Sequence, residues 1–574
     1  MIEKGTNTVA NRILDRMSEE QLYLLHQSMN ELDRHYDEGM QLVRNSEDGD
    51  LARHSTRSSA HYAIGLLSRQ SEGDLERACA VLNKVLEMQL DAPDEIYHGT
   101  FLTTPQAKLP PKGNYPWKSL GAGHAYFLAS TFEKIAAKMV EQASGADGQE
   151  RLSDEERQAV RSRLWSAVDE VLPPVWNSYD PNWREFIGCA FAIILELFES
   201  MLPAELTRRM DAAMKKTVAG SIDRRLSDAI PMNTNIELMH MFIADFYGAR
   251  FRNAEWIAHA KREAASFVES FREFGTFAEF NSTTYYGVDL TVLGLIRQFG
   301  KLEEVRSMGQ EVEQGLWNNI ALYYNANLEN LSGPFSRAYD MEMREHSSMG
   351  VFIYLALGAG YEHLAGLNCE SAHDPMIALV GVNVPEPVLP VLKSYQTDRY
   401  AERQFRELCE RHEPGKNSHL CTATAWIERD IMIGGLSGSR NTSGQLHPAT
   451  IHWMTQDGNK YYLRLLRREV GGHWSTHLRG IVIDARAAKD ELSAQIELNT
   501  DRDIEVLFEI IGPNIGQVPL SEACWKLPGI TLNIEAEAPA PHFSVHGDHA
   551  EIIYTYRAGS DDHAMRFKLS VFPN

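Results

Sequence analysis

The spacing of hydrophobic residues changes its period once along this chain, and that change limits the folds open to it. From about residue 50 to residue 365, apolar residues recur with helical spacing in segments of roughly 16 to 22 residues. After about residue 385 they alternate with polar residues, a period of two that is typical of strands. The pattern therefore predicts a helical domain followed by an antiparallel β-domain.

The helical segments are separated by short breaks rich in Pro, Gly, Asn and Asp, so neighbouring helices should form antiparallel hairpins. We expect helices at 54–69, 73–90, 121–142, 153–171, 182–201, 204–226, 234–249, 253–273, 283–299, 302–325 and 341–359. No sequence motif repeats clearly along them, which favours a closed α/α toroid of helix pairs over an open solenoid.

Strands are expected at 448–456, 460–467, 478–487, 492–499, 503–512, 529–536, 549–557 and 564–572. Turn residues separate them and no helical pattern intervenes, as in an antiparallel β-sandwich. Three prolines, Pro385, Pro387 and Pro390, predict a stiff connection that stops helix propagation. The expected domains are a toroid at 1–384, a linker at 385–395 and a sandwich at 396–574.

Charge and composition exclude several function classes. The formal net charge is -23, from 79 acidic and 56 basic residues, which should repel nucleic acid and anionic membranes. The sequence shows no signal peptide and no apolar run long enough for a membrane span, and its six cysteines are scattered without a CxxC pair. We expect a cytoplasmic protein that binds neither nucleic acid nor membrane, and leave open whether it forms a homo-oligomer.

A polar and aromatic cluster precedes the helix expected at 283–299. It contains Glu279, Asn281, Tyr285 and Tyr286. Asn281 could simply cap the helix while the tyrosines pack at its start. A tyrosine facing a cleft could instead transfer protons, provided that a positive group or strong hydrogen-bond donors adjust its pKa.

The run Gly275-Thr276-Phe277-Ala278-Glu279, followed by Tyr285, resembles a segment of heparinase II/III-type and alginate-lyase-type polysaccharide lyases. In those enzymes a Gly-Ser-Phe-x-Glu stretch precedes the catalytic tyrosine, and an α/α toroid precedes a β-sandwich. The resemblance implies a lyase that cleaves uronate-containing oligosaccharides or polysaccharides by β-elimination, with Tyr285 as a catalytic residue.

Two asparagines, Asn233 and Asn235, begin the helix expected at 234–249. Thr234 and Glu237 fit a capping box, so the segment can be explained as a helix start. In lyases of the resembled type an asparagine at a toroid loop binds the uronate carboxylate, and Asn235 or Asn233 matches it. Those lyases carry a histidine beside that asparagine, whereas here the nearest histidine, His240, stands five residues after Asn235.

A third cluster lies between residues 333 and 346 and holds Arg337, Tyr339, Asp340, Arg344 and His346. On a helix, Asp340 with Arg344 and Glu342 with His346 would form solvated pairs four residues apart. The cluster would equally supply the cation, hydroxyl and imidazole that a lyase needs. Three further residues, Trp183, Trp117 and His98, are candidates for stacking on a sugar or lining the same end of the domain, the alternative being ordinary packing.

Three functions stay open at this point. As a lyase, the protein would hold a uronate carboxylate with Asn235 and Arg337, take a proton with His346 or Tyr285, and donate one from Tyr285. As an inverting glycoside hydrolase, it would pair Glu279 with Asp340, Asp289 or Asp180 around a water. As a non-catalytic protein, it would only bind sugar. No cofactor or metal is predicted, because the histidines of the β-domain fall in loops and strands without ligand spacing.

Overall fold

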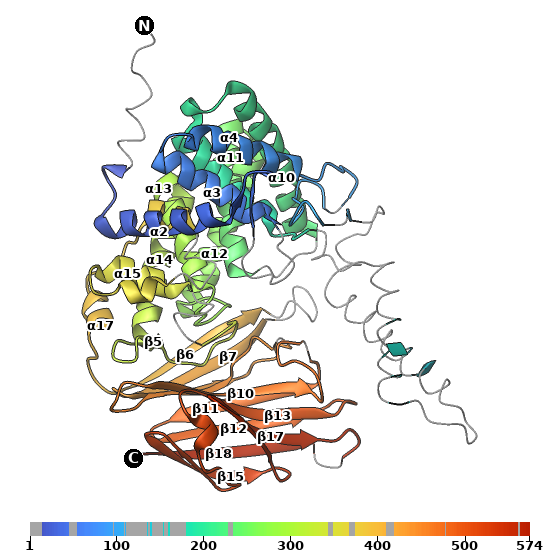
Figure 1. The fold of residues 1–574 in the computed structure, drawn as a ribbon, viewed down its shortest axis with the longest axis vertical. Helices are drawn as coiled ribbons and strands as arrows, with labels where there is room; N and C mark the ends of the chain where they lie inside the picture. Colours follow the sequence, from blue (N-terminus) through green and yellow to red (C-terminus); the bar gives the residue numbers. More distant parts are fainter. Residues whose placement is uncertain are drawn as a thin grey trace.

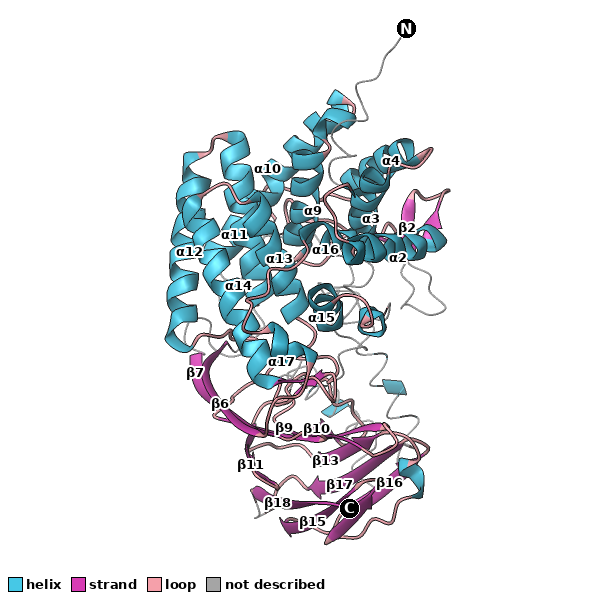
Figure 2. Ribbon diagram, turned by 90° about the vertical axis from the view of Figure 1, so that its left-hand side faces the viewer, coloured by secondary structure: helices cyan, strands magenta, loops and turns pink. Residues whose placement is uncertain are grey.

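The computed structural model describes residues 14–44, 54–95, 97–107, 109–110, 179–227, 233–341, 348–366, 374–408, 418–442, 444–476, 478–560 and 563–574, with isolated residues between 135 and 163. A helical domain lies at one end of the molecule and two β-sheets at the other (Figures 1 and 2).

Helix pairs form a closed ring. The inner helices are α3 (Thr56–Arg69), α9 (Trp183–Leu197), α11 (Thr234–Phe251), α13 (Tyr286–Phe299) and α16 (Pro375–Val380). Each contacts the next, and α16 contacts both α13 and α3, so that the ring closes. Their outer partners, in the same order, are α4 (Asp74–Glu87), α10 (Ala204–Ser227), α12 (Ala254–Phe274), α14 (Glu303–Tyr323) and α2 (Glu19–His35). The predicted α/α toroid is confirmed.

Burial follows from the side-chain pattern of each helix. The inner helix α11 is apolar nearly all round, and almost every residue from Thr234 to Gly248 is buried. The outer helix α12 buries one stripe that includes His259, Ala264, Phe267 and Phe271, at helical spacing. A helix that is apolar all round is stable only when neighbouring elements cover it on every side. The position of α11 inside the ring provides that cover.

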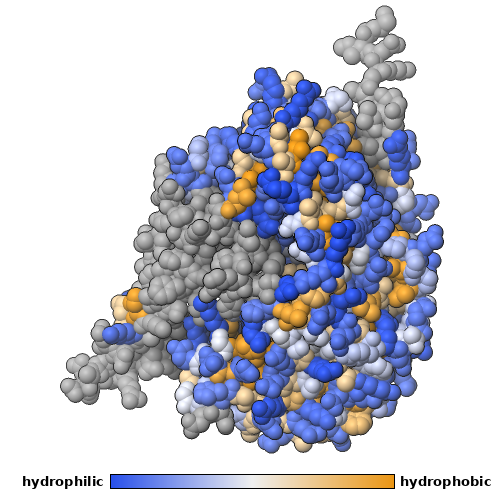
Figure 3. Space-filling model, turned by 180° about the vertical axis from the view of Figure 1, so that it is seen from behind, coloured by the Kyte–Doolittle hydropathy of each residue, from blue (hydrophilic) through white to orange (hydrophobic). Residues whose placement is uncertain are grey.

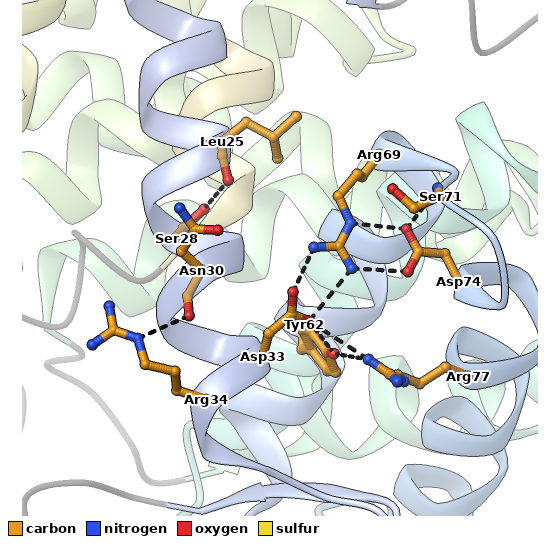
Figure 4. Close-up of polar contacts among 10 residues, drawn as sticks. All are labelled: Leu25, Ser28, Asn30, Asp33, Arg34, Tyr62, Arg69, Ser71, Asp74 and Arg77. Carbon is orange, nitrogen blue, oxygen red and sulfur yellow. Dashed lines mark hydrogen bonds and ion pairs between the residues drawn. The ribbon is translucent and has the colours of Figure 1, made fainter.

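The outer helix α2 was not predicted, and ion pairs fix it to the ring. Arg69 on α3 donates to Asp33 on α2 at 2.5 Å and to Asp74 on α4 at 2.9 Å. The Tyr62 hydroxyl donates to Asp33 at 2.6 Å and accepts from Arg77 at 3.1 Å (Figure 4). Three helices therefore share one charged network across their contact.

The β-domain is a sandwich of two antiparallel sheets. One sheet has the order β16-β17-β13-β10-β9-β8-β7-β6 and the other β11-β12-β18-β15-β14. The first contains β6 (Arg399–Leu408), β7 (Ser418–Ile427), β8 (Ile431–Ser437), β9 (Ala449–Met454), β10 (Lys460–Glu469), β13 (Ile504–Ile511), β16 (His542–His546) and β17 (His549–Tyr556). The second contains β11 (Ile481–Ala488), β12 (Glu491–Leu498), β14 (Cys524–Leu527), β15 (Ile530–Glu537) and β18 (Ala564–Pro573).

The larger sheet is the middle layer of the molecule. Strand β12 alternates buried and exposed residues, as a strand with one covered face does, whereas β10 is buried over most of its length. The toroid covers part of the second face of the larger sheet at β6: the ring of Phe280 stacks on that of Phe405 at 4.6 Å, and Arg406 pairs with Glu273 of α12 at 2.7 Å.

The remaining elements are short. They are α15 (Met349–Leu357), α17 (Leu389–Lys393), the 3-10 turns η1 (Glu199–Met201), η2 (Glu362–Ala365) and η3 (Ile515–Gln517), the hairpin β4 (Tyr324–Asn325) with β5 (Asn330–Leu331), and, on the toroid, the small sheet β1 (Tyr36–Asp37), β2 (Leu42–Arg44) and β3 (His54–Ser55).

Several local predictions need correction. Strands β6, β7, β8, β14 and β16 were missed, and the segment predicted as a stiff linker contains α17, with Pro390 in its first turn, where a missing N–H costs nothing. Of the helix expected at 341–359, the structure describes α15, which begins at Met349. Residues 342–347 lie outside the described residues. The helices expected at 121–142 and 153–171 lie largely outside them too.

The surface is mostly hydrophilic on the face in Figure 3, with apolar residues scattered singly or in small groups. None of the helices in the described ranges is long and apolar enough to cross a bilayer.

A close backbone approach at the domain boundary predicts the effect of one substitution. A Cβ on Gly434 in β8 would overlap the carbonyl of Gly333 in the toroid. We expect Gly434→Ala to destabilise the protein by about 1–3 kcal/mol, measured as a lower urea midpoint, because neither backbone can yield easily. Gly39→Ala is the control, since its Cβ would make only ordinary contact with Asp37; equal midpoints for the two variants would contradict the prediction.

Candidate functional site

The loop at residues 333–341 is hydrogen-bonded to the β-domain. The N–H of Phe335 donates to the carbonyl of His447 at 3.1 Å, and the N–H of His447 donates back at 2.9 Å. The N–H of Ala338 donates to the carbonyl of Gln445 at 2.9 Å. The sandwich thus fixes the path of a toroid loop that carries Arg337 and Tyr339.

The same loop is hydrogen-bonded on its other side to the turn before α13. The N–H of Ser336 donates to the carbonyl of Phe280 at 3.1 Å, and the N–H of Tyr339 donates to the Thr284 hydroxyl at 3.1 Å. The Ser282 hydroxyl donates to the carbonyl of Arg337 at 2.5 Å. Two sequence clusters more than fifty residues apart therefore meet along their backbones.

An ion pair joins the side chains of these two clusters. Arg337 Nη1 donates to Glu279 Oε1 at 2.8 Å, and its Nε donates to Gln445 Oε1 at 3.1 Å. The second carboxylate oxygen of Glu279 accepts from the backbone N–H of Asn235, at the start of α11, at 3.4 Å. Glu279 is buried, whereas the Arg337 side chain keeps 23% exposure. The site thus combines three toroid segments and one β-domain residue around a charge pair.

Tyr285 stands beside this pair at the start of α13. The Arg337 guanidinium lies 4.7 Å from the centre of the Tyr285 ring. The Tyr285 hydroxyl donates to the hydroxyl of Tyr339 at 3.1 Å. Tyr285 is 9% exposed and Tyr339 41% exposed, so the hydroxyl pair leads from the interior to solvent. Burial raises the pKa of Tyr285 well above its usual value, and nearby Arg337 offsets only part of this rise. The phenol is therefore protonated at neutral pH and can act as a proton donor.

A second carboxyl group lies near Glu279. Asp289, one turn after Tyr285 on α13, is fully buried, and neither of its oxygens has a hydrogen-bond partner among the described residues. Burial, and then the charge of Glu279, raise the pKa of Asp289 well above its usual value. The site therefore holds a carboxylate paired with arginine and a neutral carboxylic acid, two different protonation states of the same chemical group.

Asn235 also presents an unused polar atom. Its side chain is buried at the first turn of α11, and its Oδ1 has no hydrogen-bond partner among the described residues. A buried amide oxygen without a partner is costly in a protein that performs no function there, and a bound ligand is one way to satisfy it. Asn233, the preceding N-cap residue, makes no capping bond with its side chain.

Two predicted substrate-binding residues are structural instead. The side-chain amide of Asn281, a residue with positive φ, donates to the carbonyls of Ser332 at 2.6 Å and Pro334 at 2.9 Å. The Tyr286 hydroxyl accepts from the N–H of Asn281 at 2.6 Å. Both side chains are buried, and through these bonds they support the loop at 333–341.

The other candidates are more dispersed. Asp340 accepts from the N–H of Met341 at 2.6 Å, which orients its carboxylate within its own loop. Trp183 and His98 lie near the start of α9, where the carbonyl of His98 accepts from Arg184 at 2.9 Å. Burial lowers the pKa of His98. No contact among the described residues joins Trp183 or His98 to Tyr285.

Three candidates, Trp117, Arg344 and His346, lie outside the described residues. His240 is described, and it is unsuited to be a base for substrate, because it is fully buried in the wall of the toroid. Asp180 accepts from the N–H of Asn182 at 2.7 Å, and burial raises the pKa of Asp180 to about 6. Sequence reasoning missed Gln445, which no local motif distinguishes, since its role depends on the contact between the two domains.

Comparison with known proteins places the chain in a family. The description "Domain of unknown function (DUF8769)" matches residues 22–132 and 159–380, and the chain belongs to that family. No curated protein matches the chain.

Solved structures of similar architecture include a heparinase III, at 9% identity and a TM-score of 0.34, covering 100% of this chain and 86% of that one. A chondroitin AC lyase from Streptomyces coelicolor in complex with chondroitin sulphate has 10% identity and a TM-score of 0.34, with 96% and 83% covered. Endoglucanase CelQ from Clostridium thermocellum with cellotriose has 9% identity and a TM-score of 0.27, with 97% and 93% covered.

The buried acid predicts a pH dependence of stability. Because the pKa of Asp289 is raised in the folded state, the unfolded chain releases its proton at lower pH, and stability should fall as pH rises above about 4. Asp289→Asn removes this penalty. We expect its free energy of unfolding, measured in urea, to exceed that of the wild type by an increasing margin between about pH 4 and pH 8, with a slope of at most about 1.4 kcal/mol per pH unit. A margin that is constant with pH would contradict the raised pKa.

Proposed function

We propose that this DUF8769 family member is a carbohydrate-active enzyme, and specifically an oligosaccharide or polysaccharide lyase that cleaves uronate-containing glycans by β-elimination. The observation that carries the proposal is the convergence of Asn235, Arg337 and Tyr285 around Glu279 at the domain boundary. These residues come from three separate segments, and each supplies a group that the reaction requires.

The first requirement is neutralisation of the uronate carboxylate. The proton beside that carboxylate is weakly acidic, and it becomes removable only when donors stabilise the negative charge that develops on the carboxylate oxygens. In our proposal the partly exposed guanidinium of Arg337 and the side-chain N–H of Asn235 donate to the carboxylate, while Oδ1 of Asn235 is available to accept from a sugar hydroxyl. Glu279 and Gln445 hold Arg337 in place through its Nη1 and Nε atoms.

The second requirement is a pair of proton-transfer groups. A base takes the proton from the carbon beside the carboxylate, a carbon–carbon double bond forms, and the bond to the leaving oxygen breaks. The protonated phenol of Tyr285 donates to that oxygen, and Tyr339 can return a proton to Tyr285 from solvent along their hydrogen bond. We assign the base to His346, which belongs to the same cluster in the sequence and carries an imidazole, the side chain whose unperturbed pKa is nearest to neutrality.

The buried carboxyl pair supports a second candidate function. Asp289 in its neutral form and Glu279 in its charged form are the acid and base states that an inverting glycoside hydrolase combines. In such an enzyme Asp289 would protonate the leaving oxygen and Glu279 would activate water. Asp289 is fully buried and Glu279 nearly so, whereas the Tyr285–Tyr339 pair reaches solvent, and for this reason we rank the lyase first.

The products and one substitution distinguish the candidates. Incubated with uronate-containing oligosaccharides, the protein should release products that absorb in the ultraviolet, because elimination leaves a double bond conjugated to the carboxylate. We expect Tyr285→Phe to lower kcat by about 10²–10⁴-fold, the range of a general acid. Tyr400→Phe, which changes an exposed tyrosine on β6, is the matched control.

Reducing sugar released without ultraviolet absorbance, together with loss of turnover in Asp289→Asn, would instead support the hydrolase. Undiminished turnover of the true substrate by Tyr285→Phe would contradict the lyase mechanism.

A further inference from the structure

Three side chains with metal-binding atoms meet between α11 and α12, in the wall of the toroid. The Nε2 atoms of His240 and His259 face each other at 2.8 Å. Glu263 stands one turn after His259 on α12, and one ligand atom from each of the three residues lies within 4.8 Å of the others. His240 is 0% exposed and His259 3% exposed. Two imidazoles and a carboxylate are a common ligand set for zinc in proteins.

The hydrogen bonds behind His240 leave its Nε2 atom available as a ligand. The Ser221 hydroxyl donates to Glu185 Oε1 at 2.5 Å, so its oxygen can accept from Nδ1 of His240, which lies 2.7 Å away. The proton of His240 is then on Nδ1, and the lone pair of Nε2 points at His259. Metal-bound histidines are typically oriented by such a bond from the other ring nitrogen.

The Glu263 carboxylate is also held in place by a hydrogen bond, which uses only one of its two oxygens. Its Oε2 accepts from Arg225 Nε at 2.7 Å, and no hydrogen bond from another described residue occupies Oε1. A second carboxylate, Glu237, accepts from Arg225 Nη2 at 2.7 Å. The positive charge of Arg225 is therefore balanced by two carboxylates beside the histidine pair, which lessens its repulsion of a cation.

We infer that His240, His259 and Glu263 bind a divalent transition metal ion such as Zn²⁺, which would cross-link α11 to α12. Tetrahedral coordination with Zn–N bonds of about 2.0–2.1 Å needs Nε2 atoms about 3.3 Å apart, so the imidazoles would have to separate by only about half an ångström. Three protein ligands leave a fourth position for water. The site is separate from the proposed catalytic cluster and does not depend on the proposed function.

A comparable cluster in the β-domain lacks these features. Both oxygens of Glu551 accept from Arg468, at 2.8 Å and 2.9 Å, and Glu509 accepts from Arg464 and His549. Arginine therefore already neutralises both carboxylates, and the group is an ion-pair network. His549 is consequently a matched control for the histidines of the toroid.

The test uses the full chain, stripped with a chelator, incubated with Zn²⁺ and desalted before its metal content is measured by mass spectrometry. We expect about one Zn²⁺ per chain in the wild type and in His549→Gln, and none in His259→Gln or Glu263→Gln. Co²⁺ should give the visible absorption of a tetrahedral site. Circular dichroism confirms that each variant is folded, and Zn²⁺ should raise the Tm of the wild type and of His549→Gln but not that of His259→Gln or Glu263→Gln.

Ser221→Ala tests the orienting bond. It should weaken Zn²⁺ binding by about 10–100-fold without abolishing it, because the ligands remain while His240 loses its partner. Equal zinc content in the wild type and in folded His259→Gln would overturn the inference, and the close approach of the histidines would then be a hydrogen bond between neutral rings.

Discussion

The ion pair between Arg337 and Glu279 is the interaction on which the proposed site depends. Arg337 lies on a loop whose backbone is bonded to Gln445 and His447 on one side and to the turn before α13 on the other. Neither domain alone would fix that loop. The contact between toroid and sandwich therefore positions the guanidinium, which in turn contacts Tyr285 and reaches Asn235 through Glu279. Buried pairs of this kind contribute orientation more reliably than stability.

Burial sets the protonation states around this pair. Removal from water favours the neutral forms of Tyr285 and Asp289 and raises the pKa of both acids. A phenol and a carboxylic acid that keep their protons at neutral pH are donors, and the carboxylate of Glu279 is held by Arg337, so these residues provide two acids and a cation for anion binding rather than a free base. For this reason we assign the base to His346, which lies outside the described residues.

The sequence predicts the fold well wherever periodicity is strong. Helix α12 and strands such as β12 and β18 carry clear patterns, and the single change of period separates the two domains. Strand β8 was missed because both faces of its sheet are covered there, which replaces alternation with continuous burial. Strand β6 does alternate between covered and exposed residues, so its pattern was available in the sequence. Helices α2 and α16 were missed because one precedes the periodic region and the other is only six residues long.

The site was predictable only in part, for a related reason. Motif resemblance pointed to Glu279 and Tyr285, and the structure brings Arg337, Tyr339 and Asn235 to them. The sequence around Asn281 and Tyr286 resembles a functional cluster equally well. In the structure, however, the Asn281 side chain donates to the backbone at the start of the loop at 333–341, and the Tyr286 hydroxyl accepts from the N–H of Asn281. Gln445 and the pairing of His240 with His259 arise from contacts between distant segments, which local sequence does not encode.

A crystal structure of the Tyr285→Phe variant with a bound uronate oligosaccharide would test the central claim most directly. Our account predicts that the uronate carboxylate lies within hydrogen-bonding distance of both Arg337 and the Asn235 amide, with the leaving oxygen next to the ring of residue 285. A sugar bound elsewhere on the toroid, or a carboxylate that contacts neither residue, would contradict it.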